Sequence, residues 1–171
     1  MSEGRKRHSH EHRQDLAGEY RWGDAGQIAL LILFIIGTSA DVFVLKLSDS
    51  WQDAILWYFR MVIVLPAIVV AGYFSQRAHK KVFEEQRTEL MVITTDVFAR
   101  IRHPMYFGSI LLYVGFVILS LSVIALAIFV VVVIFYYYLC RYEEQLLLAK
   151  LGDKYRRYMK NVPMLFPKLR T

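Results

Sequence analysis

Cysteine and charged residues are scarce in this sequence. Its 171 residues include one cysteine and are 56% hydrophobic but only 21% charged. Because Cys140 has no second cysteine to pair with, no disulfide can form within the chain and nothing depends on an oxidising compartment. We expect Cys140 to be a small core residue, with acylation as the alternative because it lies near a predicted membrane boundary. The excess of apolar side chains over ordinary soluble domains indicates a membrane protein of one domain.

Charge is missing altogether from Pro104 to Cys140. A single helix of that length would be nearly twice as long as the hydrocarbon core of a bilayer. The segment should therefore fold back on itself. Ser120 and Ser122 are the only polar residues near its midpoint, so we expect a tight helical hairpin there, although neither glycine nor proline marks the turn.

Four segments are apolar enough to cross a bilayer, which takes about 20 helical residues, or about 17 at the short end. We expect an all-α integral membrane protein with about four transmembrane helices, a tight C-terminal helical hairpin and a cytoplasmic C-terminal helical segment. The four predicted spans are residues 26–47, 54–75, 105–120 and 122–140. The expected parts of the chain are a polar N-terminal tail (1–25), two N-terminal transmembrane helices (26–75) and a C-terminal core with two transmembrane helices and a cytoplasmic tail (76–171).

The net charge of +6 is not accompanied by a signature of nucleic-acid binding, such as zinc-finger spacing or a basic-region heptad. Lys and Arg flank the apolar segments instead, in the N-terminal tail, after the second span and in the C-terminal tail. The two opposite connections hold almost nothing beyond Lys46. By the positive-inside rule, both termini are expected to be cytoplasmic. Polar chemistry would then lie on the cytoplasmic side.

The N-terminal tail is too long and too charged to precede a cleaved signal peptide, so we expect the first span to be a retained anchor. His8, His10 and His12 alternate within this tail. They lack cysteine or carboxylate partners at ligand spacing, so a solvated tail is favoured over a metal site, and no metal is expected.

Two ionisable residues, Asp41 and Arg60, lie within predicted spans and would be costly in hydrocarbon unless paired. They come to the same depth in an antiparallel pair of helices. We therefore expect a structural ion pair. A proton relay is the alternative, but it would need further acidic or histidine partners along its path.

Residues 100–108 read RIRHPMYFG and form the densest group of hydrogen-bonding side chains, at the start of the third span. Pro104 suits the first position of a helix, which places His103 at the N-cap and Tyr106 in the first turn. A helix N-terminus favours an anion, and the arginines add to that field. The alternative is that these residues are interfacial anchors and an aromatic belt. The segment before them, MVITTDVFARIR, is rich in β-branched residues and is expected to be extended.

A second group, RYEEQLL, follows the last span, with FYYY directly before it. Arg141, Glu144 and Gln145 are spaced i, i+3 and i+4 and are expected to share one face. The alternative is an intrahelical ion pair on a solvated face. The helix should continue to a C-cap at Gly152 and be followed by a short basic amphipathic piece. The hairpin would bring both groups to one end, where they could hold a zwitterionic, adenine-bearing cofactor and an anionic lipid-like substrate.

Two motifs resemble the isoprenylcysteine carboxyl methyltransferase family and related phospholipid methyltransferases. They are RHPMYFG, from Arg102 to Gly108, and EEQLLLAKLGDKYRRYMKNVPMLFP, from Glu143 to Pro167. The resemblance covers about residues 85–168. It implies S-adenosylmethionine as the methyl donor, bound in a cytoplasm-facing pocket beside the C-terminal segment.

By the same resemblance, the residues named at the end of this paragraph would bind the cofactor, and Glu144 would accept hydrogen bonds from it. The family usually reads TGxY where this chain has TDVF, so Asp96 replaces a glycine and Phe98 a tyrosine. Arg141 is the candidate for the arginine on the substrate side, and Arg141 and Glu144 are the predicted catalytic residues. The predicted cofactor-binding residues are Leu90, Met91, Val92, Ile93, Phe98, Arg102, His103, Pro104, Met105, Tyr106 and Glu144.

The resemblance predicts a membrane-embedded methyltransferase with a lipid-like acceptor, foremost carboxyl O-methylation of a prenylcysteine-type substrate. A carboxylate is ionised at neutral pH and needs no general base. An amine or thiol acceptor would have to lose a proton, for which His103 and Glu144 are the candidate bases. Alternatives are a phospholipid N-methyltransferase, a small-thiol S-methyltransferase, an NADPH-dependent sterol-type reductase, and a non-enzymatic scaffold that holds anionic lipids. The sequence names neither the acceptor nor the oligomeric state.

Overall fold

A computed structural model describes residues 23–84 and 91–167, and these residues form helices and no strand. The elements are α1 (Gly23–Ala40), the π-helical turn η2 (Asp41–Leu45), α2 (Asp49–Ala54), α3 (Trp57–His79), a second π-helical turn η3 (Lys80–Glu84), the 3₁₀ turn η4 (Asp96–Ala99), α4 (Pro104–Ser120), α5 (Val123–Leu151) and α6 (Asp153–Asn161). Their order confirms the predicted all-α fold.

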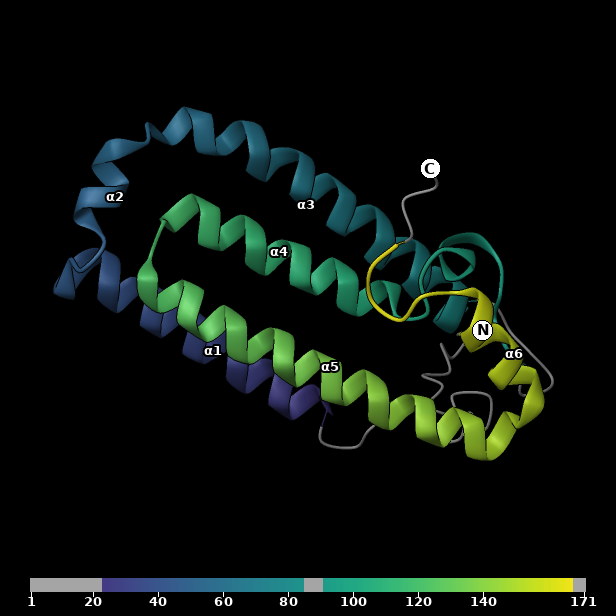
Figure 1. The fold of residues 1–171 in the computed structure, drawn as a ribbon. Coiled ribbons are helices and arrows are strands. Elements are labelled where there is room, and N and C mark those ends of the chain that lie inside the picture. Colours follow the sequence, from purple (N-terminus) through teal and green to yellow (C-terminus); the bar gives the residue numbers. More distant parts are fainter. Residues whose placement is uncertain (1–22, 85–90, 168–171) are drawn as a thin grey trace, which may run out of the picture.

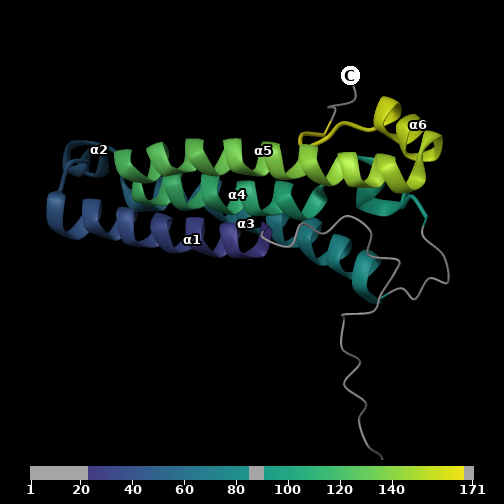
Figure 2. The same cartoon turned by 90° about the horizontal axis from the view of Figure 1, so that it is seen from below.

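Four long helices run side by side, with α4 between α3 and α5 and with α1 along α5 (Figures 1 and 2). Within residues 23–84 and 91–167, three apolar helical segments are long enough to cross a membrane: Gly23–Leu45, Trp57–Phe83 and Val123–Leu151. The apolar helix Pro104–Ser120 is shorter. Ile36 on α1 is 61% exposed and Val62 on α3 is 70% exposed, which places apolar surface where lipid would cover it. The chain is an integral membrane protein.

The predicted hairpin is present between α4 and α5. Leu121 ends α4 with φ +48°, a left-handed conformation, and its N–H donates to the carbonyl of Val117 at 2.8 Å. Ser122 caps α5 by accepting a hydrogen bond from the N–H of Ala125 at 3.0 Å. A single residue in the left-handed region and a serine cap therefore make the turn without glycine or proline.

The predicted ion pair between Asp41 and Arg60 is wrong. The carboxylate of Asp41 accepts hydrogen bonds from the hydroxyls of Ser48 at 2.6 Å and Ser122 at 2.5 Å, and from the N–H of Leu47. Arg60 donates to backbone carbonyls, among them Ile55 and, at 3.0 Å, Leu119. The chain turns at this end of the bundle, so free hydroxyls and carbonyls satisfy each charge separately.

The second predicted span continues beyond the apolar segment, through α3 and η3 to Glu84. Pro66 lies inside α3 without ending it. The segment before α4 is extended only as far as Thr95, so the prediction of an extended 91–102 is partly wrong. Asp96 adopts φ +59° and reverses the chain, which buries Val97 and Phe98 of η4 in an apolar cluster.

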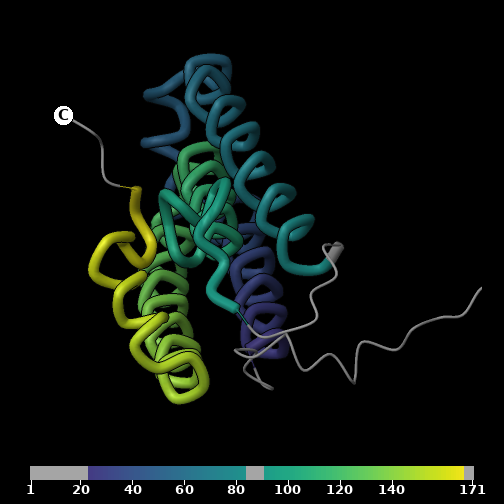
Figure 3. The backbone as a smooth tube through the Cα atoms, turned by 90° about the vertical axis from the view of Figure 1, so that its right-hand side faces the viewer, coloured from purple at the N-terminus to yellow at the C-terminus, as the bar shows by residue number. Residues whose placement is uncertain are grey.

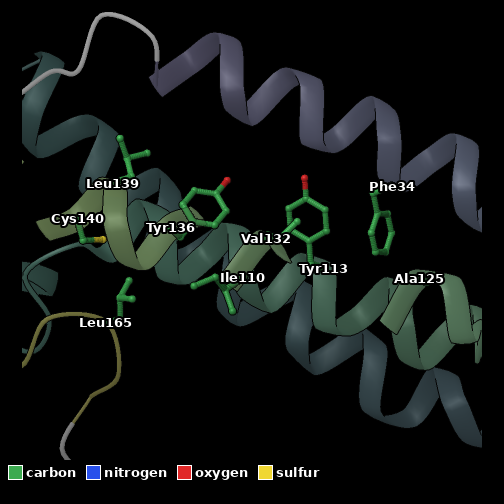
Figure 4. Packing of buried hydrophobic residues seen from close by; sticks show 9 residues of the cluster. All are labelled: Phe34, Ile110, Tyr113, Ala125, Val132, Tyr136, Leu139, Cys140 and Leu165. Atoms are coloured by element: carbon green, nitrogen blue, oxygen red, sulfur yellow. The ribbon is translucent and has the colours of Figure 1, made fainter. Parts of the chain in front are cut away.

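The main apolar cluster joins α1, α4, α5 and the C-terminal segment (Figure 4). Cys140 is completely buried in this cluster, as predicted for a core residue and against the alternative of acylation. α5 extends to Leu151 with Gly152 as its C-cap, again as predicted. The buried members are Phe34, Ile110, Tyr113, Ala125, Val132, Tyr136, Leu139, Cys140 and Leu165.

Candidate active site

The start of α4 is held in place by the C-terminal segment. Pro104 is the first residue of α4 and His103 is its N-cap, as predicted, but the His103 side chain makes no capping bond. Instead, the backbone N–H of Arg102 donates to the carbonyl of Pro163 at 3.0 Å, and that of His103 donates to the carbonyl of Met164 at 3.1 Å. These two bonds fix the backbone, so both side chains can face α5.

α6 packs beside the segment that precedes α4 (Figure 3). The hydroxyl of Tyr158 donates to the carbonyl of Phe98 at 2.6 Å. Burial raises the pKa of Tyr158, which keeps the phenol protonated and able to donate. Tyr158 of the second motif thus holds the backbone of η4, and Pro163 holds that of the first motif.

Five side chains from the two motifs meet where α4 begins. We call Arg102, His103, Tyr106, Glu143 and Glu144 the five-residue cluster. Arg102 Nη1 lies 3.1 Å from Glu144 Oε1, and His103 Nε2 lies 3.4 Å from the same oxygen. His103 Nδ1 lies 3.5 Å from Glu143 Oε2, and the hydroxyl of Tyr106 donates to Glu143 Oε1 at 2.5 Å. The prediction that the two motifs meet at one end is confirmed.

His103 is the centre of this cluster. Its ring stacks on that of Tyr106, with 5.7 Å between centroids and 8° between planes. Burial would lower the pKa of His103, but its interactions with Cys140, Glu143 and Glu144 outweigh burial and raise that pKa well above its ordinary value. Carboxylates on both sides of the ring therefore favour the imidazolium form in the protein without ligand.

Four buried atoms of the cluster make no hydrogen bond: Arg102 Nε and Nη1, His103 Nε2 and Glu144 Oε1. Arg102 and Glu144 are within ion-pair distance, but their geometry is not that of a hydrogen bond. Buried polar atoms in proteins are almost always hydrogen-bonded. Buried donors and an acceptor that lie next to one another without a hydrogen bond are typical of a site for a polar ligand.

The remaining predicted cofactor-binding residues take no part in the bonds described above. Leu90 lies outside the described residues, and Met91 is exposed. Val92 packs against the α6 tyrosines, whereas Ile93 and Met105 pack in the apolar cluster that contains Phe98. Their predicted roles toward a cofactor stay predictions.

Arg141 lies apart from the five-residue cluster. Arg141 and Gln145 are exposed and line one hollow, as expected for a shared face, but Glu144 is 2% exposed, so the prediction is wrong for Glu144. Nor do Arg141 and Glu144 form an ion pair in the part of the chain that the structure describes; Glu144 pairs with Arg102 instead. Arg141 lines a hollow of about 390 Å³ together with Phe135, Tyr138, Leu139, Tyr142 and Gln145. Its role in orienting a substrate stays a prediction.

Glu143 is the site residue that the sequence analysis missed. Tyr136, Cys140 and Glu143 are spaced by four and three residues, so they lie on one face of α5. All three side chains are at least half-buried next to α4. The helical spacing from the buried cysteine would have indicated that Glu143, like Glu144, faces inward.

Comparison with known proteins decides the family. The model of the phospholipid methyltransferase family matches residues 51–154, more than half of the chain and all of the five-residue cluster. The chain belongs to this family. The resemblance inferred from the two motifs is thereby confirmed, and membership supports an enzyme that methylates.

Among characterised relatives, the chain is 26% identical over 160 residues to a methanethiol S-methyltransferase from Pseudomonas deceptionensis. The alignment covers 85% of this chain and 58% of the relative, so the chain spans little more than half of that protein's length. No solved structure matches the chain.

Proposed function

We propose that this member of the phospholipid methyltransferase family uses S-adenosylmethionine as its methyl donor and binds it at Arg102 and Glu144. The observation that carries the proposal is the set of four buried atoms without hydrogen bonds. S-adenosylmethionine carries a carboxylate, an ammonium group, ribose hydroxyls and an adenine amine. Arg102 can donate to a carboxylate, and Glu144 can accept from an ammonium, amine or hydroxyl group, so the residues fit the donor.

The donor, when bound, supplies a methyl group activated by a positively charged sulfur. The side chains of this chain would orient it and exclude water. The exposed fractions of the Arg102, His103 and Glu144 side chains are 9%, 7% and 3%. The backbone hydrogen bonds from the N–H groups of Arg102 and His103 to the carbonyls of Pro163 and Met164 hold this arrangement before any ligand arrives.

The acceptor that we favour is a small apolar thiol that reaches the site from the membrane. The characterised relative acts on methanethiol by its name. A thiol must lose its proton before it can attack, and the imidazole of His103 with its flanking carboxylates offers a group that can take it.

Carboxyl O-methylation of a prenylcysteine-type substrate is the second candidate. It is favoured by the exposed guanidinium of Arg141 in a hollow lined by aromatic side chains, where an anionic lipid-like molecule would be stabilised. Against it, the hollow shares no lining residue with the five-residue cluster.

Incubation of the purified protein in detergent with methyl-labelled S-adenosylmethionine separates these candidates. The acceptor panel would contain methanethiol or a longer alkyl thiol, a prenylcysteine, and phosphatidylethanolamine. We expect label in the thiol. Label only in the prenylcysteine would replace the first acceptor by the second, and absence of donor binding by calorimetry would overturn the proposal.

Glu144→Gln provides the sharper test of the donor site. Hydrogen bonds to charged groups contribute about 1.5–3 kcal/mol, so we expect donor affinity to fall about 10- to 100-fold. Calorimetric titration would measure it. Asp153→Asn, at an exposed carboxylate on α6, is the matched control and should bind normally. Unchanged affinity in Glu144→Gln would refute this role.

A further inference from the structure

Glu143 has no part in the donor site proposed above, yet both of its carboxylate oxygens are engaged. Oε1 accepts the short hydrogen bond from Tyr106 at 2.5 Å, and Oε2 lies 3.5 Å from Nδ1 of His103. The Glu143 side chain is 12% exposed. A buried carboxylate anchored on one oxygen and directed at an imidazole nitrogen with the other suits the task of orienting that imidazole.

We infer that His103 is the general base that takes the proton of the thiol acceptor and that Glu143 is the residue that positions it. The inference rests on the thiol acceptor proposed above. Nε2 is the nitrogen that would take the proton, because it is buried, makes no hydrogen bond and lies with Arg102 beside Glu144 in the donor site, whereas Nδ1 faces Glu143. The stacked ring of Tyr106 fixes the plane of the imidazole.

The step balances with the groups already named. The S–H bond of the thiol breaks, its proton goes to Nε2 of His103, and its electron pair stays on the acceptor sulfur. That pair forms the new bond to the methyl carbon, while the bond between this carbon and the donor sulfur breaks and leaves its pair on the donor sulfur. The imidazolium then returns its proton to water.

The charge on Glu143 sets the pH at which this base works. His103 is faced from α5 by Glu143, Glu144 and Cys140, and from its own segment by Arg102 and Tyr106. From α6, Tyr155 is within electrostatic range of Glu143, Glu144 and Arg102. An adjacent negative charge favours the imidazolium, so its removal lowers the pKa of His103. Because only the neutral imidazole accepts a proton, activity should rise with pH through this pKa.

Glu143→Gln tests the inference through two readouts. The first is NMR titration of the histidines in the protein without ligand, with the His103 signal assigned by its loss in His103→Gln. The second is the pH profile of kcat for thiol methylation. An opposite charge at this distance shifts a pKa by about 1–3 units, so both curves should move to lower pH by about one unit or more. Asp153→Asn should leave both unchanged.

The outcomes separate this inference from the proposed function. If the protein methylates a thiol but neither the titration nor the pH profile moves in Glu143→Gln, the inference is overturned and the proposed function stands. If no thiol is methylated, the proposed thiol acceptor is refuted, and with it the role of His103 as a general base. A His103 titration that still depends on Glu143 would then support only the interaction between the two side chains. Should Glu143→Gln not fold, Glu143→Asp keeps the charge farther from the ring and should shift both curves in the same direction by less.

Discussion

At the scale of single residues, Asp96 and Phe98 explain how the chain departs from the motif that it resembles. Asp96 has φ +59°, in the left-handed region that glycine favours and that Asp tolerates better than most residues. Its carboxylate pairs with Arg77 at 3.2 Å. Phe98 uses its carbonyl to accept the Tyr158 bond, and its ring is buried among apolar side chains. An aspartate can therefore replace the glycine, and Phe98 needs no hydroxyl.

Arg141 carries the residue-scale prediction. If it orients an anionic acceptor, Arg141→Ala should lower kcat/KM for a prenylcysteine at least tenfold while donor affinity stays nearly intact. Steady-state kinetics together with calorimetry would show this. Arg157→Ala, on the exposed face of α6, removes an equal charge and is the control. A comparable loss of donor affinity would contradict the role, and an unchanged rate would assign Arg141 to the surface.

At the scale of elements, the packing of α3 on α4 positions the site. Gly108 lies one turn after His103 on α4 and is buried. A Cβ atom at Gly108 would be 2.9 Å from the carbonyl oxygen of Ala71 on α3 and in collision with the hydroxyl of Ser75. The backbone carbonyl cannot move aside as a side chain can. Glycine therefore allows the close approach that sets the depth and direction of the first turn of α4.

Gly108→Ala should therefore destabilise the protein, although alanine is the better helix former. Overpacking of this kind typically costs about 1–3 kcal/mol. Thermal unfolding in detergent would register it as a lower melting temperature, with weaker donor binding as the start of α4 shifts. Gly72→Ala on α3 meets nothing within 4 Å and is the control, which should match or exceed the parent in stability. Equal melting temperatures for the two variants would contradict the close-approach argument.

At the scale of the whole molecule, the two ends of the bundle differ in chemistry. At the α2 end, Asp41, Ser48 and Arg60 tie the chain to the turn between α4 and α5. α6 and the start of α4 lie at the other end (Figure 1). The five-residue cluster and the basic side chains of α6 are at that end. The positive-inside rule predicts that the α6 end faces the cytoplasm. Donor from the cytoplasm and acceptor from the lipid would then meet at one end of the bundle.

Cysteine labelling in cells tests this orientation, because the native Cys140 is buried and should not react. Lys154→Cys on α6 and Asp53→Cys on α2 place one exposed thiol at each end. A membrane-impermeant maleimide should label Asp53→Cys in intact cells, and Lys154→Cys only after permeabilisation. The reverse pattern would invert the topology, and labelling of both in intact cells would refute a bundle that spans the membrane.

The sequence alone determined what depends on local composition. The charge-free segment up to Cys140 required a hairpin, Pro104 marked a helix start and Gly152 marked a helix end. Two motifs identified the family. These features could be predicted because apolar length, helix capping and motif spacing depend on residues that are close together in the sequence. The tertiary structure decided which side chains meet. That depends on the rotation and depth of each helix against its neighbours, which no single segment encodes. In the folded chain, Asp41 accepts hydrogen bonds from two serines, Arg141 lies on the surface, and Glu143 lies next to His103.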